Sequence, residues 1–450
     1  LRDNGLDMNR GGNNNTAILN LNQGGLLEVD RVYVGDNRGT QVLNFNGGTL
    51  KGAATGVTLI SGMNQMNLFG GGMTIDTAGQ NQTISDVIAG AAGKGVASIP
   101  VLDGGDGYIG PPLVEISGGG GQYATARAIV DPVTGKLTSI EVTSPGLNYT
   151  NAPTITLSGG GATRTAQLGT PVLTDNVSGG LTKLGAGTLT LSAKNTYTGG
   201  TVVDAGTLVL GGGANSMTNV SGNNILVRSN ATLTFGGGDT FGNHLATVLN
   251  TITAEQGATI NNNGGYMNSL GDVTLKGATL SSSGTSTFAW SLKGLVTADG
   301  ATTSTISGQV IGLGAGSVTG TVFNVLDGAA SNDLNVTAVL ANGAGPSWPT
   351  AQASSLTKNG AGTMTLNAQN SYTGGTTVNG GTLVLNDTWN GAAAGYPGIG
   401  VVRGSLTINS GATVVINSSG NGEAGGALGW SGTSQVTNLV INGGLLDAYN

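Results

Sequence analysis

The residues able to carry out acid–base or metal chemistry are few and widely spaced in this sequence. The chain has a single histidine, His244, and 23 aspartate and glutamate residues among 450. Glycoside hydrolysis needs two carboxyl groups about 5 to 9 Å apart, and lyase chemistry usually needs an acidic cluster that holds Ca²⁺ plus a basic residue. No two aspartates are adjacent, and His244 in FGNHLAT has no obvious partner. We expect His244 to lie in a turn or in solvent, and the sequence predicts no catalytic residue.

Two glycine-rich stretches resemble ligand-binding loops at first sight. LDGGDGYIG places Asp103 and Asp106 beside glycines, but Ca²⁺-binding nonapeptides need tandem copies and a different aspartate offset. SGGGGQ, from Ser117, lacks the Gly-Lys-Ser/Thr ending and the following helix of a phosphate-binding loop. Both stretches are therefore predicted to be turns. The sequence predicts no metal ligand, no cofactor-binding residue and no cofactor.

Aromatic side chains are a further source of chemistry, because exposed tryptophans stack on sugars. The chain has four tryptophans, and their spacing is unrelated to the repeats described below: Trp290, Trp348, Trp389 and Trp430. We expect these side chains to plug loops and cap ends rather than to bind sugars.

The composition indicates which elements must position these residues. Glycine accounts for 84 of 450 residues, and charged residues for 9%, where about 25% is usual. The hydrophobic share of 38% is high enough for the chain to fold. Glycines occur in pairs and triplets between short runs of Val, Ile, Leu and Thr, which is how turns separate strands, and no long helical periodicity is present. The sequence therefore predicts an almost entirely β protein, and the absence of cysteine excludes disulfides.

Charge and hydropathy exclude two classes of partner. The net charge is −7, and the 16 lysines and arginines form no basic patch of the kind that binds nucleic acid. No run approaches the roughly 18 apolar residues of a membrane helix. We expect no nucleic-acid partner and no transmembrane segment in this chain.

A short pattern recurs along the chain: alternating apolar residues, a Gly- or Asn-rich turn, a threonine and a further apolar residue. Four successive anchors of this pattern are Leu208, Leu233, Ile260 and Leu280. Their spacing of about 20 to 27 residues is typical of solenoids, in which each repeat buries its apolar face only by stacking on its neighbours. Strand parity agrees, because Leu189 and Leu191 would share one face and the threonines between them the other. The fold predicted is all-β, a parallel β-solenoid (β-helix) whose coils of about 20 to 27 residues carry Asn and Thr ladders.

A longer stretch occurs twice. LTKLGAGTLTLSAKNTYTGGTVVDAGTLVL (181–210) and LTKNGAGTMTLNAQNSYTGGTTVNGGTLVL (356–385) agree at 22 of 30 positions. The stretch resembles the passenger-associated strand repeat of bacterial autotransporters and related surface proteins. In the first copy the signature is carried by Gly185, Gly187, Leu189, Leu191, Asn195, Tyr197, Gly199, Thr201, Val203, Gly206, Thr207, Leu208 and Leu210. The resemblance implies a location outside the cell or on the bacterial cell surface.

Between residues 99 and 168 the pattern changes. GDGYIGPPLVEISGGGG, from Gly105, and GLNYTNAPTITLSGGG, from Gly146, share a tyrosine, a proline, an alternating apolar pair and S-G-G-G at equivalent offsets. They resemble repeats of bacterial and phage surface proteins. Between them, ATARAIV and KLTSIEVTS alternate as strands around the turn DPVTGK. We expect a small β module inserted into the solenoid, and expect it to make contacts with other molecules.

The sequence thus predicts N-terminal solenoid coils in 1–98, the inserted module in 99–168 and further solenoid in 169–450. The function favoured is a non-enzymatic extracellular structural or adhesive rod, a cell-surface passenger or scaffold. Two alternatives stay open: a filament subunit formed by end-to-end stacking, prompted by the similarity of LNLNQGGLLEVD at Leu19 to LVINGGLLDAYN at Leu439, and a less favoured polysaccharide-degrading β-helix enzyme. Expected partners are further copies of the chain, or cell-surface or extracellular polymers.

Overall fold

The computed structural model describes residues 5–9, 14–263, 267–283, 289–345, 350–387, 400–418, 425–429 and 435–448. Strands make up 51% of the structure and helix 1%, so the protein is all-β; the helix among the described residues is α1 (Gly425–Leu428). Two compact units form: unit 1 comprises Leu1–Asp76, Ser85–Thr182 and Asn195–Gly200, and unit 2 comprises Thr77–Ile84, Lys183–Lys194 and Thr201–Asn450. Strand β20 (Leu181–Leu184) contains one of the boundaries between them. Trp348, Trp389 and Trp430 lie outside the described residues.

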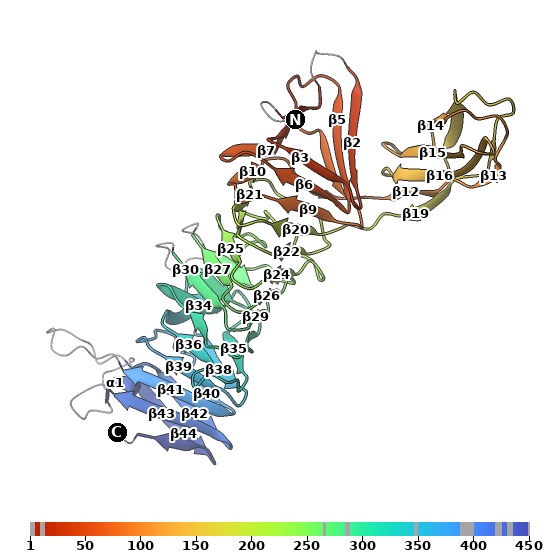
Figure 1. The fold of residues 1–450 in the computed structure, drawn as a ribbon. Helices are drawn as coiled ribbons and strands as arrows, with labels where there is room; N and C mark the ends of the chain where they lie inside the picture. The colour runs from red at the N-terminus through yellow and green to blue at the C-terminus, as the bar shows by residue number, and fades with distance from the viewer. Residues whose placement is uncertain are drawn as a thin grey trace. The chain divides into compact units, whose positions relative to one another are not determined.

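Unit 2 is a stack of coils whose strands run in parallel (Figure 1). One sheet contains, in hydrogen-bonded order, β10 (Gln82–Ile84), β21 (Thr188–Leu191), β23 (Thr207–Leu210), β25 (Thr232–Phe235), β27 (Thr259–Asn262), β30 (Thr279–Ser282), β33 (Ser304–Ile306), β36 (Leu334–Val336), β39 (Thr363–Leu366), β41 (Gly381–Asp387), β43 (Ala412–Ser418) and β45 (Leu445–Asp447). A second contains β22 (Thr201–Val203), β24 (Ile225–Val227), β26 (Ile252–Ala254), β29 (Val273–Leu275), β32 (Val296–Ala298), β35 (Gly320–Val325), β38 (Ser355–Asn359), β40 (Thr376–Val378), β42 (Gly404–Asn409) and β44 (Val436–Asn442). A third, shorter sheet contains β28 (Asn268–Leu270), β31 (Trp290–Leu292), β34 (Val310–Ala315) and β37 (Val339–Ala344).

The register between coils confirms the predicted parallel β-solenoid. The four anchors predicted to be equivalent pair directly in the first sheet, Leu208 with Leu233, Leu233 with Ile260, and Ile260 with Leu280. The same buried column contains Leu189, Leu208, Leu233, Ile260, Leu280, Ile306, Val336, Leu366, Leu385 and Ile416. Because strand side chains alternate, the threonines between these aliphatic residues point to the outer face. Removal of this apolar surface from water is the main force that holds the coils together.

The coils vary in length more than the sequence predicts. The step along the column from Leu189 to Leu208 is shorter than the predicted range, and the step from Leu385 to Ile416 is longer. The strands keep their register while the extra residues lie in the turns, which face solvent and tolerate insertion.

Asparagine ladders join the outer edges of successive coils, as the sequence predicts. One ladder links Asn417 to Asn386, Asn386 to Asn367 and Asn367 to Asn335, with amide-to-amide distances of 2.7, 2.8 and 2.6 Å. A second runs through Asn442, Asn409, Asn379 and Asn359. Each amide within a ladder donates to the coil before it and accepts from the coil after it, while the amides at the two ends are seen in one role only, so identical residues stack at the strand spacing.

Trp290 is a core residue, which corrects the expectation of a loop plug or end cap. It lies in β31, is 0% exposed and packs edge-on against Phe235 with ring centroids 5.0 Å apart. Its indole N–H donates to the Ser281 carbonyl at 2.7 Å, which satisfies the polar atom of the buried ring.

Unit 1 contains three groups of parallel strands of the same type, of which the second is a separate four-stranded sheet and the other two belong to the two long sheets. They are formed by β1 (Leu6–Asp7), β4 (Val32–Tyr33) and β7 (Val57–Ser61); by β2 (Thr16–Asn22), β5 (Thr40–Asn46), β8 (Gln65–Leu68) and β11 (Ala89–Gly90); and by β3 (Leu26–Val29), β6 (Gly48–Gly52) and β9 (Met73–Asp76). Leu43, Phe45, Leu50 and Ile75 are fully buried in its core.

A second part of unit 1 is antiparallel and appears as a separate group of strands in Figure 1. Its pairs are β12 (Lys94–Ser98) with β19 (Val172–Asp175), β13 (Val101–Asp103) with β18 (Gln167–Leu168), β14 (Leu113–Ser117) with β17 (Thr154–Ser158), and β15 (Thr125–Asp131) with β16 (Lys136–Ser144). It has its own hydrophobic core, in which Ile99, Leu137 and Ile140 pack with two tyrosines, Tyr108 and Tyr149.

The two Tyr/Pro/S-G-G-G repeats of this segment fit each other reciprocally. The ring of Tyr149 lies where a Cβ at Gly121 would be, and the ring of Tyr108 lies against Gly160, so each glycine run borders the tyrosine of the other repeat. The amide of Thr150 donates to Gly119 O and the amide of Ile109 to Gly160 O, both at 2.9 Å. The glycines after Ser117 are therefore needed to leave space for an aromatic ring, and the structure gives them a packing role.

Candidate functional site

Each copy of the long repeat buries a lysine that the sequence analysis did not single out. In β20, Leu181 and Lys183 point inward and the residues between them are less buried, so Lys183 lies at a core position with 0% exposure. Its ammonium donates to the carbonyls of Gly185, Gly187 and Ala205 at 2.5, 2.6 and 2.8 Å. These carbonyls belong to glycine-rich turns, and the Gly187 carbonyl also accepts from the Thr207 amide at 3.1 Å, so the ammonium is a shared donor to several turn acceptors at once.

Lys358 repeats this arrangement in the second copy. It is 0% exposed, and its Nζ donates to Gly360 O at 3.0 Å and to Gly380 O at 2.8 Å. Burial lowers the pKa of Lys358 to about 8, opposed by the negative charge of Asp333. Asp333 accepts from the Gly328 and Thr363 amides at 2.9 and 2.8 Å. A carboxylate and an ammonium thus hold the turns of adjacent coils.

Other polar residues of the repeat also bind backbone. Asn195 accepts from the Ile88 amide at 3.0 Å, and the equivalent Asn370 accepts from Leu340 N at 2.8 Å and donates to Val401 O. Tyr372 is fully buried and shares a 2.6 Å hydrogen bond with Thr376, and burial raises the pKa of its phenol. Asn195, Asn370 and Tyr372 lie between β21 and β22 or between β39 and β40, outside the named strands, so strand parity gave no signal for them. The hydrogen-bonding groups of these residues are used to hold the coils together.

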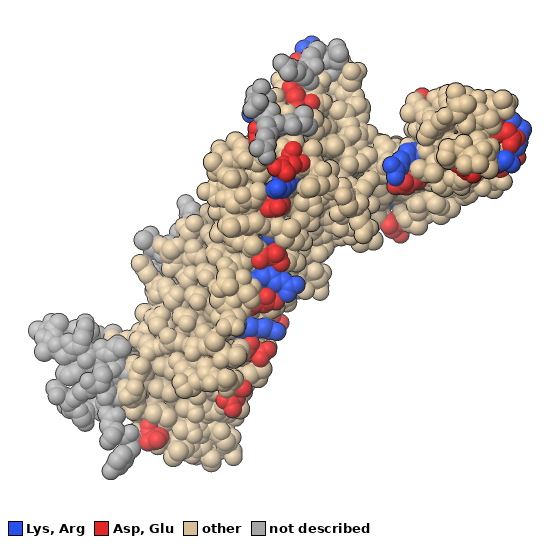
Figure 2. Space-filling view, in the orientation of Figure 1, with Lys and Arg blue, Asp and Glu red and all other residues tan. Residues whose placement is uncertain are grey.

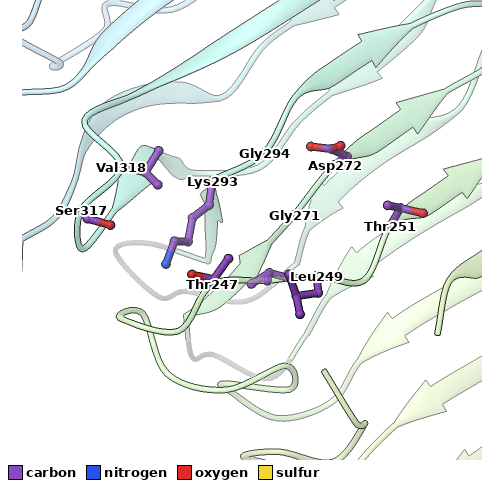
Figure 3. A pocket seen from close by; sticks show the side chains of 10 residues that line it. Thr247, Leu249, Thr251, Gly271, Asp272, Lys293, Gly294, Ser317 and Val318 are labelled. Atoms are coloured by element: carbon purple, nitrogen blue, oxygen red, sulfur yellow. The ribbon is translucent and has the colours of Figure 1, made fainter. Parts of the chain in front are cut away.

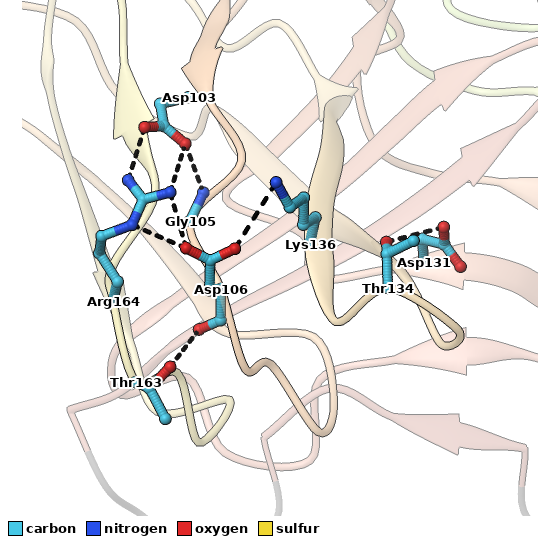
Figure 4. A network of polar contacts seen from close by, with 8 residues as sticks. All are labelled: Asp103, Gly105, Asp106, Asp131, Thr134, Lys136, Thr163 and Arg164. Carbon is cyan, nitrogen blue, oxygen red and sulfur yellow. Dashed lines mark hydrogen bonds and ion pairs between the residues drawn. The ribbon is translucent and has the colours of Figure 1, made fainter.

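The aspartates of LDGGDGYIG form ion pairs with an arginine that the sequence analysis did not connect to them (Figure 4). Arg164 Nη1 lies 2.5 Å from Asp103 Oδ2, and Arg164 Nη2 lies 2.8 Å from Asp106 Oδ2. Lys136 approaches Asp106 at 3.5 Å. The Arg164 hydrogen bond lowers the pKa of Asp103 to about 2 and also lowers that of Asp106. This exposed network joins the end of β13, the loop before β18 and the start of β16, and the arginine is a stabilising partner of both aspartates.

A cavity of about 350 Å³ lies in unit 2, bordered by the irregular residues 236–251 (Figure 3). Hydroxyl groups of Thr247, Thr251 and Ser317 face it, together with Lys293 and Asp272. Lys293 Nζ donates to the carbonyls of His244 and Ala246 at 2.9 and 2.5 Å, and Asp272 accepts from Leu295 N at 2.8 Å. Both charged groups therefore hold loops in place, and burial lowers the pKa of Lys293.

His244 lies in this same irregular segment and is half-buried. The expectation that it has no partner is too simple, because it is close enough to Asp239 to lower the pKa of that carboxyl, which burial raises more strongly. Its carbonyl, as noted, anchors Lys293. Both residues lie in an irregular segment, which gave no periodic signal from which this proximity could be predicted.

Charged side chains of opposite sign lie next to each other on the face shown in Figure 2. Ion pairs of this kind in the described residues include Arg127 with Glu141 and Arg228 with Glu255, at 2.7 and 2.8 Å. Among the described residues, no group of three or more His, Asp or Glu side chains is placed to hold a metal ion. In the part of the chain that the structure describes, no helix is long and apolar enough to cross a membrane.

These features define a parallel β-solenoid protein whose coils are joined by aliphatic columns, asparagine ladders and buried lysines. Residues 181–210 and 356–385 match the family described as Passenger-associated-transport-repeat, which confirms the resemblance drawn from the sequence. The repeat implies a secreted or surface-exposed passenger domain. Searches of curated proteins and of solved structures found no match.

Proposed function

We propose that this chain is a non-enzymatic structural or adhesive segment of a bacterial cell-surface passenger. The observation that supports this most is the inward use of polar chemistry in both copies of the repeat. Lys183, Lys358, Asn195 and Asn370 all bind backbone atoms. A stretch of this kind joins one coil to the next and extends a scaffold. The antiparallel segment around residues 99–168 serves, in this proposal, as an inserted module that makes contacts.

Two measurements test this proposal: where the chain is located on the cell, and whether the purified chain degrades polysaccharides. An antibody against the chain should label intact cells of the source organism, and external protease should remove the label. The purified chain should release no reducing ends or unsaturated products from neutral or acidic polysaccharides. Label that appears only after permeabilisation, or a product that accumulates with time, would contradict the proposal.

A second candidate, end-to-end stacking into a filament, is favoured by one observation at β44. Leu439 and Ile441 pair with the buried Leu406 and Ile408 of β42, yet they are 43% and 48% exposed. A further coil laid on β44 would cover them, and in this candidate that coil comes from another copy of the chain. Electron microscopy should then show filaments that Ile441→Glu abolishes, whereas a monodisperse monomer at high concentration removes this candidate.

A further inference from the structure

A short asparagine ladder in unit 1 differs from those of unit 2 in where it ends. Asn44 donates to Asn20 at 2.8 Å, and Asn67 donates to Asn44 at 2.9 Å. At the other end, Asn20 donates to Thr125 Oγ1 in the antiparallel segment at 2.8 Å. Every amide of the ladder therefore points its N–H toward β2 and its oxygen toward β11.

The ladder stops at Asn67, because the position paired with it in β11 is Ala89. Asn67 is only 4% exposed. In the part of the chain that the structure describes, no donor reaches its Oδ1. This end of the ladder therefore presents an amide oxygen, which can accept a hydrogen bond from an incoming N–H or O–H group.

The space beyond Asn67 is a cavity of about 320 Å³, near the lower end of small-molecule sites. Gln65, which precedes Asn67 on the same face of β8, also lines it. Its Oε1 is buried and has no hydrogen-bond partner. The side chains of Gln65 and Asn67 thus border one small volume, and the Gln65 oxygen, which lacks a partner, is covered from solvent as the side chain stands.

The remaining walls are apolar or small. Val87 and Leu147 provide aliphatic surface, and no charged residue lines the cavity. Tyr123 packs against the cluster that contains Leu147, and its backbone has a left-handed φ of 65°. The site thus fits a neutral molecule that has several donors on one side and C–H groups on the other.

We propose that this cavity, formed by Gln65, Asn67, Val87, Ala92 and Leu147, binds a neutral sugar residue. Adjacent hydroxyls of a pyranose ring donate to the Asn67 oxygen and, once the Gln65 side chain turns its covered Oε1 toward the cavity, to the Gln65 oxygen as well, while the C–H face of the ring packs on the aliphatic wall. A lone carboxamide has its donors on one nitrogen and fits the two separate acceptors less well. An acidic sugar would enter without a cation to pair with it.

Saturation-transfer NMR of the full chain with N-acetylglucosamine, galactose, mannose, glucose and glucuronate tests this proposal, with acetamide as the amide probe. We expect transfer to at least one neutral sugar and none to glucuronate or acetamide. Gln65→Met removes an acceptor that makes no hydrogen bond within the described fold, so it should leave the thermal midpoint unchanged or raised. It should also weaken sugar binding about tenfold, the effect of one lost neutral hydrogen bond.

Ala92→Leu is a second variant, which fills the cavity from an exposed position and should also abolish transfer. Gln309→Met, at an exposed glutamine of unit 2, is the matched control and should bind as the parent does. Absence of transfer to every sugar, binding that Gln65→Met and Ala92→Leu leave unchanged, or transfer to acetamide or glucuronate alone would overturn the proposal. Surface labelling of cells would be unaffected by such a failure, so the proposed function is tested separately.

Discussion

Replacement of Lys358 by methionine should change how stability depends on pH. An unfolded lysine has a pKa of about 10.4, and burial lowers that of Lys358 in the folded protein to about 8. Between these values the unfolded chain holds a proton that the folded chain has released. The unfolded state then binds more protons, so stability rises with pH in this window and is lowest when Lys358 is charged.

The size of the effect follows from the two pKa values. Linkage over pH 7.5 to 9.5 predicts that this one residue raises the free energy of unfolding by about 2 kcal/mol. Above about pH 10 the buried Tyr372 acts in the opposite direction, because its raised pKa keeps the folded phenol protonated while the unfolded phenol ionises. The window therefore ends below that pH.

Urea unfolding followed by circular dichroism at pH 7.5, 8.5 and 9.5 measures this effect in the parent, Lys358→Met and Lys276→Met. Lys276 is exposed, so its replacement is the matched control. From pH 7.5 to 9.5 the free energy of unfolding of the parent should rise by about 2 kcal/mol relative to that of Lys358→Met, because the contributions of all other titrating groups are the same in both proteins. The control should track the parent. A difference that stays constant, or moves the other way, would refute the inference that Lys358 is buried as a destabilised cation.

Three further variants test other parts of the fold. Arg164→Met should make the antiparallel segment susceptible to protease at neutral pH. In the parent, Asp103 contributes to the stability of this segment above about pH 4, and this contribution is lost as pH falls through about 2. Pepsin cleavage should therefore rise over that range in the parent, and should not rise in Arg164→Met. Tyr372→Phe should cost about 1 to 2 kcal/mol in urea unfolding, because a buried hydroxyl loses its partner. Gly121→Ala should lower the thermal midpoint through a clash with a tyrosine ring, at a cost of about 1 to 3 kcal/mol, whereas Gly110→Ala, which has open space, should not.

The stacking of the coils could be predicted because it depends on period and parity, which are sequence properties. Leu208, Leu233, Ile260 and Leu280 recur at nearly regular intervals, and the register that pairs them follows from burying all four. Coil length could not be predicted with the same accuracy, because residues added to a solvent-facing turn change the count without changing any buried contact.

The buried polar residues were harder to predict for an electrostatic reason. A lysine between apolar neighbours usually extends to solvent, so Lys183 carried no sign that turn carbonyls would surround its ammonium. The Arg164 network was missed because its partners lie far away in the sequence, across strands whose pairing was not predicted. The ladder end at Asn67 depends on Ala89 lying opposite it, and only the register shows this.

The duplicated stretch now has a physical explanation. Tight glycine turns leave carbonyls unpaired near the core, and every coil added to a solenoid brings more of them. Lys183 and Lys358 each donate to carbonyls of the turn that directly follows their own strand, so these carbonyls are paired within the repeat. Asn370 adds hydrogen bonds to Leu340 and Val401, one on each side of the repeat in the sequence. A stretch that pairs the carbonyls of its own turns and binds the coils beside it can occur again in the stack without changes in the neighbouring coils. This accounts for the identity of the two copies at 22 of 30 positions while the intervening coils vary.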